Sequence, residues 1–345
     1  MNTIIKQIGK IVKNKNWEQL GRVKVVQHDD LILLDYKSSC QYDGNWTPYE
    51  LACRGLIFNT EGEIVALPFP KFFNYGERLS TEPIKSVTKK MDGSLGILYR
   101  HKGQFKVATR GSFTSPQALF ATNELSKYNL QNLPYYITLL FEIIYPENRV
   151  VVNYKDYEGL ILIGATDYKN DTIYDYGTIK NLADYLGLQV TESVPFKTVN
   201  EILKAVKPLT GEEGYVALFE NGQMLKFKSD WYLQHHKIKS NFGYSYILEL
   251  LQKGMTLEDL PDEFYEEARL IALEIDNKYM AIINEAHRFM IEHSRIAVED
   301  RKQFALMAKD HPLKGIMFCI LDKKDEKKLV FKMLWDEYRE GKRGG

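Results

Sequence analysis

The chain has 345 residues, and its 46 basic and 46 acidic side chains leave it formally neutral at pH 7. Without an overall positive field, any site for a polyanion must be built locally. The three cysteines show no Cys-x-x-Cys spacing, which argues against a disulfide framework and a structural zinc site. This pattern favours a reducing, cytoplasmic compartment, and the length predicts two domains.

The N-terminal stretch is amphipathic. Ile4, Ile8 and Ile11 recur at helical spacing among lysines. The stretch lacks the continuous apolar core of a signal peptide, and no later segment has the length of a transmembrane helix. We expect a helix that packs on the first domain and no membrane association, with a membrane-surface helix as the alternative.

Residues 1–240 show the pattern of an α+β domain, with antiparallel sheets flanked by helices. The expected strands, from alternation and turn signals, are 31–35, 56–58, 63–67, 93–99, 104–109, 135–145, 148–152, 159–166, 172–176, 213–219 and 224–228. The expected helices are 116–128, 178–186 and 199–206.

From about residue 240 the apolar residues change to a period of 3.6. Ala272, Ile275, Tyr279 and Ile282 belong to such a series within the segment 261–293. Further helical segments are expected at 298–309, 313–321 and 324–338. The pattern predicts an all-helical domain from 241 to 345, with a disordered tail from Gly341.

The stretch 89–99 has the most unusual composition, because it joins an amine nucleophile to an acid and two glycines. In one interpretation Asp92-Gly93 is a β-turn with positive φ, and Lys90 is a solvated surface charge. In the other it is a covalent site, where a lysine of lowered pKa attacks an electrophile and glycine lets backbone amides approach a phosphate.

Other charged residues of the first domain support the covalent interpretation. Glu142 lies within an apolar strand, where a buried carboxylate requires a partner. Cations can neutralise phosphates, while carboxylates take a sugar hydroxyl or a divalent metal. Lys226 and Lys228 are expected to lower the pKa of Lys90 by like-charge repulsion. The set comprises Arg54, Lys71, Lys90, Lys226, Lys228, Glu142 and Glu213, and it suits a nucleoside triphosphate with a metal ion.

The order of the motifs identifies a family. They are Lys-Met-Asp-Gly-Ser at 90–94, Phe-Glu-Ile-Ile-Tyr-Pro-Glu-Asn-Arg-Val-Val at 141–151, Glu-Gly-Tyr-Val at 213–216 and Leu-Lys-Phe-Lys-Ser-Asp-Trp-Tyr at 225–232, with Cys-Arg-Gly at 53–55 and Lys-Phe-Phe-Asn at 71–74. In this set the chain resembles the RNA ligase 1 family of T-even bacteriophages, a branch of the covalent nucleotidyltransferases. The resemblance covers about 35–236, and beyond it only the helical character is similar.

The resemblance implies roles for the central residues. Lys90 would attack the α-phosphate of ATP and carry AMP, and Asp92 would order its turn. Glu142 would hold the ribose hydroxyl, and Glu213 would position Mg²⁺ or Mn²⁺. Lys226 and Lys228 would contact the α-phosphate. Nucleotide contacts are further implied for Tyr36, Arg54, Lys71, Lys89, Gly93 and Val216.

The resemblance also provides candidates for the RNA end or a later step, namely Arg110 and Tyr232. At Arg110 this chain departs from the family, which has a lysine in the corresponding Ser-Lys-Gly-Ser segment. Arginine keeps the charge but changes the geometry, so any role that needs a compact ammonium is in doubt.

The resemblance therefore predicts an ATP-dependent RNA ligase that joins 5′-phosphate and 3′-hydroxyl ends through a lysyl-AMP and an adenylated RNA end. Residues 1–240 would be the adenylyltransferase domain, and 241–345 would choose the RNA. Repair of broken tRNA anticodon loops is expected, by a monomer in the cytoplasm, or in the host cytoplasm if the source is viral.

Two alternatives remain. A DNA ligase or mRNA-capping-type enzyme shares the lysine chemistry but would be expected to have an OB-fold after the last motif. A non-enzymatic RNA-binding module would need basic residues but not Glu142 and Glu213 among them.

Overall fold

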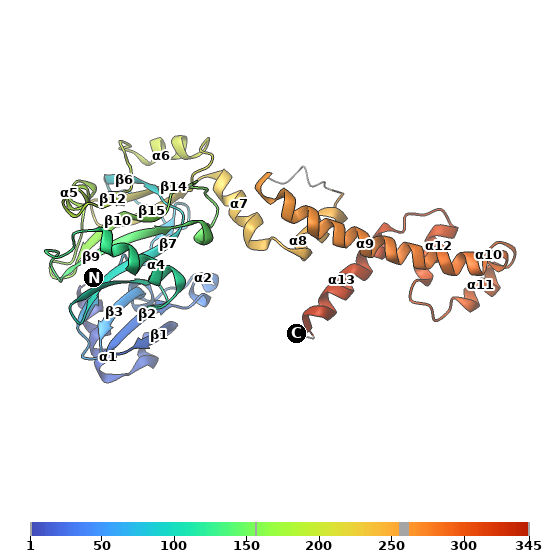
Figure 1. Cartoon of the computed structure of the whole chain (residues 1–345), viewed down its shortest axis with the longest axis horizontal. Coiled ribbons are helices and arrows are strands. Elements are labelled where there is room, and N and C mark those ends of the chain that lie inside the picture. The colour runs from blue at the N-terminus through green and yellow to red at the C-terminus, as the bar shows by residue number, and fades with distance from the viewer. Residues whose placement is uncertain (1, 156, 255–261, 344–345) are drawn as a thin grey trace. The chain divides into compact units, whose positions relative to one another are not determined.

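The structure is a computed structural model that describes residues 2–155, 157–254 and 262–343 (Figure 1). It divides into two compact units, one ending at His236 and the other beginning at Lys237. Helix α7 (Asp230–Asn241) spans this division. The boundary lies a few residues before the position expected from the sequence.

The first unit begins with a four-stranded antiparallel sheet in the order β1-β2-β3-β4. Its strands are β1 (Val23–His28), β2 (Leu31–Tyr36), β3 (Arg54–Asn59) and β4 (Ile64–Ala66). Its helices are α1 (Asn2–Asn14), η1 (Trp17–Leu20), α2 (Ser39–Asp43) and α3 (Pro48–Ala52). Ile5 and Ile8 of α1 pack with Leu34 and Phe58 in one core, so the amphipathic N-terminal pattern covers this sheet.

A six-stranded sheet follows, in the order β11-β10-β9-β7-β8, with β12 parallel to β10. Its strands are β7 (Ser94–His101), β8 (Gln104–Thr109), β9 (Ile137–Ile144), β10 (Gly159–Asp167), β11 (Thr172–Ile173) and β12 (Gln189–Val190). The helical segments here are α4 (Pro116–Glu124), η2 (Leu125–Lys127), η3 (Pro146–Asn148) and α5 (Tyr176–Leu186). Ala121 of α4 and Ile179 of α5 share one core with Phe141 and Leu160 of the sheet.

The third sheet has five strands in the order β13-β6-β14-β15-β5. They are β5 (Phe73–Asn74), β6 (Ile84–Lys90), β13 (Ser193–Val194), β14 (Gly214–Phe219) and β15 (Met224–Lys228). Helix α6 (Val199–Val206), which starts with a capping box formed by Thr198 and Glu201, packs Ile202 into its core. In Figure 1 the first sheet, in blue, lies at one end of the unit and α6 at the other.

The chain passes from the third sheet to the second at residues 90–94. Lys90 ends β6, and Ser94 begins β7. Neither Asp92 nor Gly93 has a positive φ, so the β-turn interpretation of this stretch is wrong. Gly93 is needed for another reason, since a Cβ there would lie 2.5 Å from the Ile143 carbonyl oxygen.

The second unit is helical throughout its described part. Its helices are α8 (Tyr244–Gln252), α9 (Asp262–Glu292), α10 (Ser294–Glu299), α11 (Arg301–Met307), α12 (Lys314–Leu321) and α13 (Lys327–Arg343). Phe304, Met317 and Leu334 are fully buried in its own core. Helix α13 continues through Gly341 to Arg343, so the prediction of a disordered tail is wrong for residues 341–343. Residues 255–261 and 344–345 lie outside the described residues.

The predicted fold class, antiparallel sheets with helices followed by an all-α region, is confirmed. One local prediction is wrong, because residues 148–152 form no strand. No helix in the described residues is long and apolar enough to span a membrane.

Candidate active site

A cavity of about 540 Å³ is lined by residues of all three sheets of the first unit. The predicted site residues that line it are Arg54, Lys89, Lys90, Gly93, Arg110, Glu142, Val216 and Lys226. Its apolar wall includes Phe72, Ile163 and Leu218 beside Val216, and this surface suits the faces of a purine. The cavity therefore combines apolar faces with clustered cations, as a nucleotide requires.

Lys90 is held by an ion pair. Its Nζ donates to Glu213 Oε2 at 2.7 Å, and Glu213 Oε1 accepts from Lys228 Nζ at 3.0 Å. Burial lowers the pKa of Lys90, but Glu213 and then Glu142 raise it, and the net direction is upward. The predicted lowering of the Lys90 pKa is wrong for this structure, because the two carboxylates outweigh the effect of burial.

Lys226 is the lysine whose pKa falls. Burial, followed by the charges of Arg54 and Lys90, lowers the pKa of Lys226 to about 6. Its Nζ lies 4.5 Å from the ring centroid of Phe72, a neutral partner. Lys226 and Lys228 alternate with buried residues along β15 and so share one face, but Lys228 is paired with Glu213 and Lys226 is not.

Arg54 completes the cationic wall. Its guanidinium carbon lies 5.4 Å from the Phe72 ring centroid, and its Nη1 is buried with no hydrogen-bond partner within the described part of the chain. A buried donor without a partner is costly, and an anion would satisfy it. Arg54 and Lys226 are therefore arranged to receive a phosphate.

Glu142 lies in β9, opposite Leu95 of β7 and Ile161 of β10. Burial raises its pKa to about 7, against the lowering effect of Lys90. Among the residues that the structure describes, its carboxyl group has no hydrogen-bonded or ion-paired partner. It is thus available to a ligand hydroxyl or a cation.

Asp92 anchors the loop after Lys90. Its Oδ2 accepts hydrogen bonds from the backbone N–H groups of Val151 and Val152, both at 2.7 Å. The Tyr232 hydroxyl donates to Asp92 Oδ1 at 2.8 Å, and the Asp92 N–H donates to the Tyr154 hydroxyl at 2.7 Å. The apolar run that predicted a strand at 148–152 instead supplies donors to a carboxylate. Tyr232 contacts the loop after Lys90 through Asp92 and does not line the cavity.

Lys71 and Tyr36 also lie outside the cavity lining. The Lys71 Nζ is 5.1, 5.3 and 5.7 Å from the ring centroids of Trp46, Phe73 and Tyr36. Burial, with smaller contributions from neighbouring cations, lowers the pKa of Lys71. Lys89 is paired with Glu192 at 2.9 Å.

Asp35 is a cavity residue that the sequence analysis missed. It follows the fully buried run Leu31–Leu34, and a carboxylate at the end of such a strand is a signal that could have revealed it. Its Oδ2 accepts from Arg110 Nε at 3.0 Å. Burial raises its pKa to about 6, although Arg110 and Arg54 act in the opposite direction.

The family is shown by comparison with known proteins. A family model described as RNA ligase matches residues 52–241, more than half of the chain. The chain belongs to this RNA ligase family. The family predicted from the ordered motifs is therefore confirmed, and the predicted enzyme class, an RNA ligase, is that of the family.

Known proteins that resemble this chain differ in how much of it they match. A putative RNA ligase of Thermovibrio ammonificans is 29% identical over 234 residues, which are 62% of this chain and 60% of that protein. An RNA ligase of Rhodothermus phage RM378 is 25% identical over 86% of each chain. Among solved structures, an archaeal ATP-dependent RNA ligase matches 75% of this chain and 68% of its own, at 14% identity and a TM-score of 0.48.

The segment that matches the RNA ligase family contains the predicted site residues from Arg54 to Tyr232. Asp35 and Tyr36 precede it, although Asp35 lines the same cavity and both contact Arg110. The tertiary structure thus adds strand β2 of the first sheet to the site.

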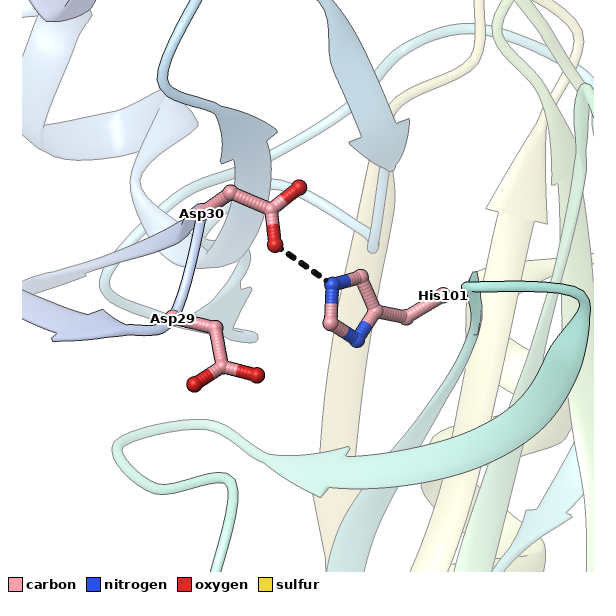
Figure 2. Close-up of side chains that lie close together, drawn as sticks. All are labelled: Asp29, Asp30 and His101. Carbon is pink, nitrogen blue, oxygen red and sulfur yellow. Dashed lines mark hydrogen bonds and ion pairs between the residues drawn. The ribbon is translucent and has the colours of Figure 1, made fainter.

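A second cluster of possible metal ligands lies away from the cavity lining. Asp29 and Asp30, in the β1–β2 turn, approach His101 at the end of β7 (Figure 2). His101 Nε2 lies 2.6 Å from Asp30 Oδ1, and Lys102 Nζ lies 3.1 Å from Asp29 Oδ2. Both acids already have partners, so this cluster ties the β1–β2 turn to the β7–β8 turn.

Proposed function

We propose that this protein is an ATP-dependent RNA ligase that works through a lysyl-AMP on Lys90. The observation that carries the proposal is the shared cavity of Lys90, Lys226 and Arg54, in which a buried arginine donor has no partner within the described part of the chain. Triphosphate oxygens would satisfy that donor and favour the protonated form of Lys226. The apolar wall at Val216 would take the adenine.

The first step follows from these positions. Neutral Lys90 Nζ attacks the α-phosphorus of ATP, a phosphorus–nitrogen bond forms, and the bond to the β-phosphate oxygen breaks to release pyrophosphate. Lys90 must first lose a proton, which Glu213 Oε2 can accept, and a second proton leaves the nitrogen for water as the phosphorus–nitrogen bond forms. Lys226 and Arg54 would stabilise the charge that develops on the phosphates.

A divalent metal, Mg²⁺ or Mn²⁺, fits the acids of the site. Glu142 and Glu213 provide hard carboxylate oxygens, and both act electrostatically on Lys90. When bound, the metal would supply charge stabilisation at the phosphates. Glu213 would have to release Lys90 or Lys228 to hold it, because both of its oxygens are engaged.

The substrate would be RNA with 5′-phosphate and 3′-hydroxyl ends, including broken tRNA anticodon loops, sealed by a monomeric enzyme in the cytoplasm. Family membership supports the RNA substrate. In the described part of residues 237–345 every regular element is a helix, which favours this function over a DNA ligase or capping enzyme with an OB-fold.

Label transfer from α-labelled ATP tests the proposal. Labelled protein should form with ATP and magnesium, and Lys90→Ala should abolish it. Lys85→Ala is a matched control, because Lys85 is an exposed lysine on the same strand, β6. Labelled adenylate on the Lys90→Ala protein would contradict the assignment.

Sealing assays then separate the substrates. Nicked tRNA, linear single-stranded RNA and nicked duplexes of RNA and DNA should be compared with ATP and magnesium. Preference for nicked DNA would favour the DNA ligase alternative, and equal labelling by GTP and ATP would favour the capping-type alternative. If no labelled protein forms with either nucleotide, the non-enzymatic RNA-binding module is the remaining alternative.

A further inference from the structure

Asp35 carries an unused hydrogen-bond acceptor in the wall of the cavity. The residue is 7% exposed and lines the cavity from the end of β2. Its Oδ2 is bound by Arg110, but Oδ1 is buried and has no hydrogen-bond partner among the described residues. Buried carboxylate oxygens normally have donors, so a ligand is the natural source of the missing one.

Arg110 fixes the direction of that acceptor. Its Nε donates to Asp35 Oδ2 at 3.0 Å, and its Nη1 donates to the Tyr36 hydroxyl at 2.9 Å. The guanidinium carbon also lies 4.7 Å from the ring centroid of Tyr36. A lysine ammonium could not make this planar fork and stack on the ring in the same way. The arginine at 110 therefore has a structural reason in this chain.

The surroundings of Asp35 select the kind of ligand. A phosphate oxygen would be repelled by the carboxylate and could not donate to it. A metal cation is disfavoured because Arg110 and Arg54 already provide positive charge beside the group. An uncharged donor remains, and a hydroxyl is the donor that a nucleotide or RNA end presents on its sugar.

We infer that Asp35 Oδ1 accepts a hydrogen bond from a substrate ribose hydroxyl, and that Arg110 is the positioning residue for this contact. The inference rests on the proposed function. The ribose can belong to ATP or to the terminal nucleotide of an RNA strand, and both sources present the same chemistry. The contact makes the enzyme favour ribose over deoxyribose.

The decisive variant is Asp35→Asn. The amide oxygen must face Arg110 Nε, because two donors would otherwise oppose each other, so the NH₂ group takes the place of Oδ1. The acceptor becomes a donor while the shape is kept. Asp35→Ala, which removes the group, is the second variant, and Arg110→Lys tests the positioning role.

The measured quantity is the ratio of the reaction rates of two substrates that differ by one hydroxyl group. One arm compares lysyl-AMP formation from ATP with that from 2′-deoxy-ATP and 3′-deoxy-ATP. The other compares sealing of a pre-adenylated RNA to acceptors that end in ribose or 2′-deoxyribose, each with a 3′-hydroxyl. Because each ratio is taken within one protein, a partly unfolded variant lowers both rates equally.

The unaltered protein should favour the hydroxyl-bearing member of one pair by about tenfold or more, and Asp35→Asn should reduce this to about twofold or less. Asp35→Ala should lose the preference too, and Arg110→Lys should reduce it. Asp29→Asn should keep it, because Asp29 is an exposed aspartate in the β1–β2 turn. The arm in which the ratio changes identifies the source of the hydroxyl.

Unchanged ratios in both arms for Asp35→Asn would overturn the inference. Equilibrium binding of ATP and its two deoxy analogues, and of the two acceptors, gives the same comparison without turnover, and unchanged binding ratios would overturn it equally. Failure of the unaltered protein to form lysyl-AMP would count against the proposed function instead, so the two failures are distinguishable.

Discussion

Lys90 Nζ and Glu213 Oε2 lie 2.7 Å apart, so the Lys90 ammonium is held in an ion pair with a buried carboxylate. The pair keeps Lys90 as an ammonium, which cannot attack phosphorus. Glu213 also binds Lys228, and it can therefore exchange partners without leaving the carboxylate uncompensated. Binding of the nucleotide and the metal would cause Glu213 to exchange its lysine partners in this way.

Replacing Glu213 with Gln should lower the pKa of Lys90, because the largest contribution that raises it is removed. The rise of the single-turnover adenylation rate with pH should move to lower pH by about one unit or more. The maximal rate should fall and its magnesium dependence weaken. Rate–pH profiles at several magnesium concentrations provide the measurement.

Glu212→Gln is the matched control, since Glu212 is the adjacent acid and pairs with Lys89 at 3.4 Å. Its rate profile should resemble that of the unaltered protein. A Glu213→Gln protein with the original profile and the original magnesium dependence would remove both roles assigned to Glu213.

Lys226→Met should stabilise the ligand-free protein at neutral pH. The pKa of Lys226 is about 6 in the folded protein and near 10.5 when unperturbed, so its contribution to stability is complete above pH 10.5 and is lost as the pH falls toward 6. Removing the amine should raise the free energy of unfolding by about 1 kcal/mol or more at pH 7. Denaturant unfolding at pH 7 and pH 10 checks this, and the gain should be smaller at pH 10.

The same depressed pKa predicts proton uptake when ATP binds. Phosphates beside Lys226 would raise its pKa again, so binding between about pH 7 and pH 8 should take up close to one proton. Calorimetry in buffers of different ionisation enthalpy measures the uptake. Lys226→Met should abolish it, and equal uptake by both proteins would exclude Lys226 as its source.

Gly93→Ala should impair the nucleophile loop. The new Cβ would lie 2.5 Å from the Ile143 carbonyl oxygen and 3.1 Å from Glu142 Cγ, so the backbone after Lys90 must shift. We expect a loss of about 1–3 kcal/mol in stability and a reduction of lysyl-AMP formation by about tenfold or more. Thermal unfolding and label transfer measure the two effects.

Gly177→Ala is the control for that change, because its Cβ would meet nothing closer than Asp175 Oδ1 at 3.4 Å at the start of α5. It should keep normal labelling and be at least as stable as the unaltered protein. If Gly93→Ala labelled as well as Gly177→Ala, close approach to β9 would not be the reason for the glycine.

A protein that ends at Ser240 should fold, accept AMP on Lys90 and lose its preference among RNA ends. The first unit has its own cores, and every cavity residue precedes the division at 236–237. Label transfer and sealing of the RNA panel provide the test. An insoluble product would show that the helical unit covers an apolar surface, and a soluble product without labelling would show that it completes the active site.

The sequence by itself determined the fold class and the family of the molecule. Amphipathic periodicity located the C-terminal helices, and alternation located β14 and β15, because these patterns depend on local spacing. The ordered motifs around Lys90, Glu142, Glu213 and Lys226 identified the family without any contact being known. Strand β6 was missed, because the polar residues Lys85, Ser86 and Thr88 hide its alternation.

Only the tertiary structure decided which charges neutralise one another. In the sequence, Lys90 and Lys226 are equivalent members of one set of basic residues. In the structure Glu213 is paired with Lys90, so the pKa of Lys90 is raised while that of Lys226 is lowered. The partner of Asp92 proved to be a run of backbone N–H groups, and Asp35 joined the cavity through Arg110, far away in the chain. Charge pairing and burial depend on distances in space, and spacing along the chain does not fix those distances.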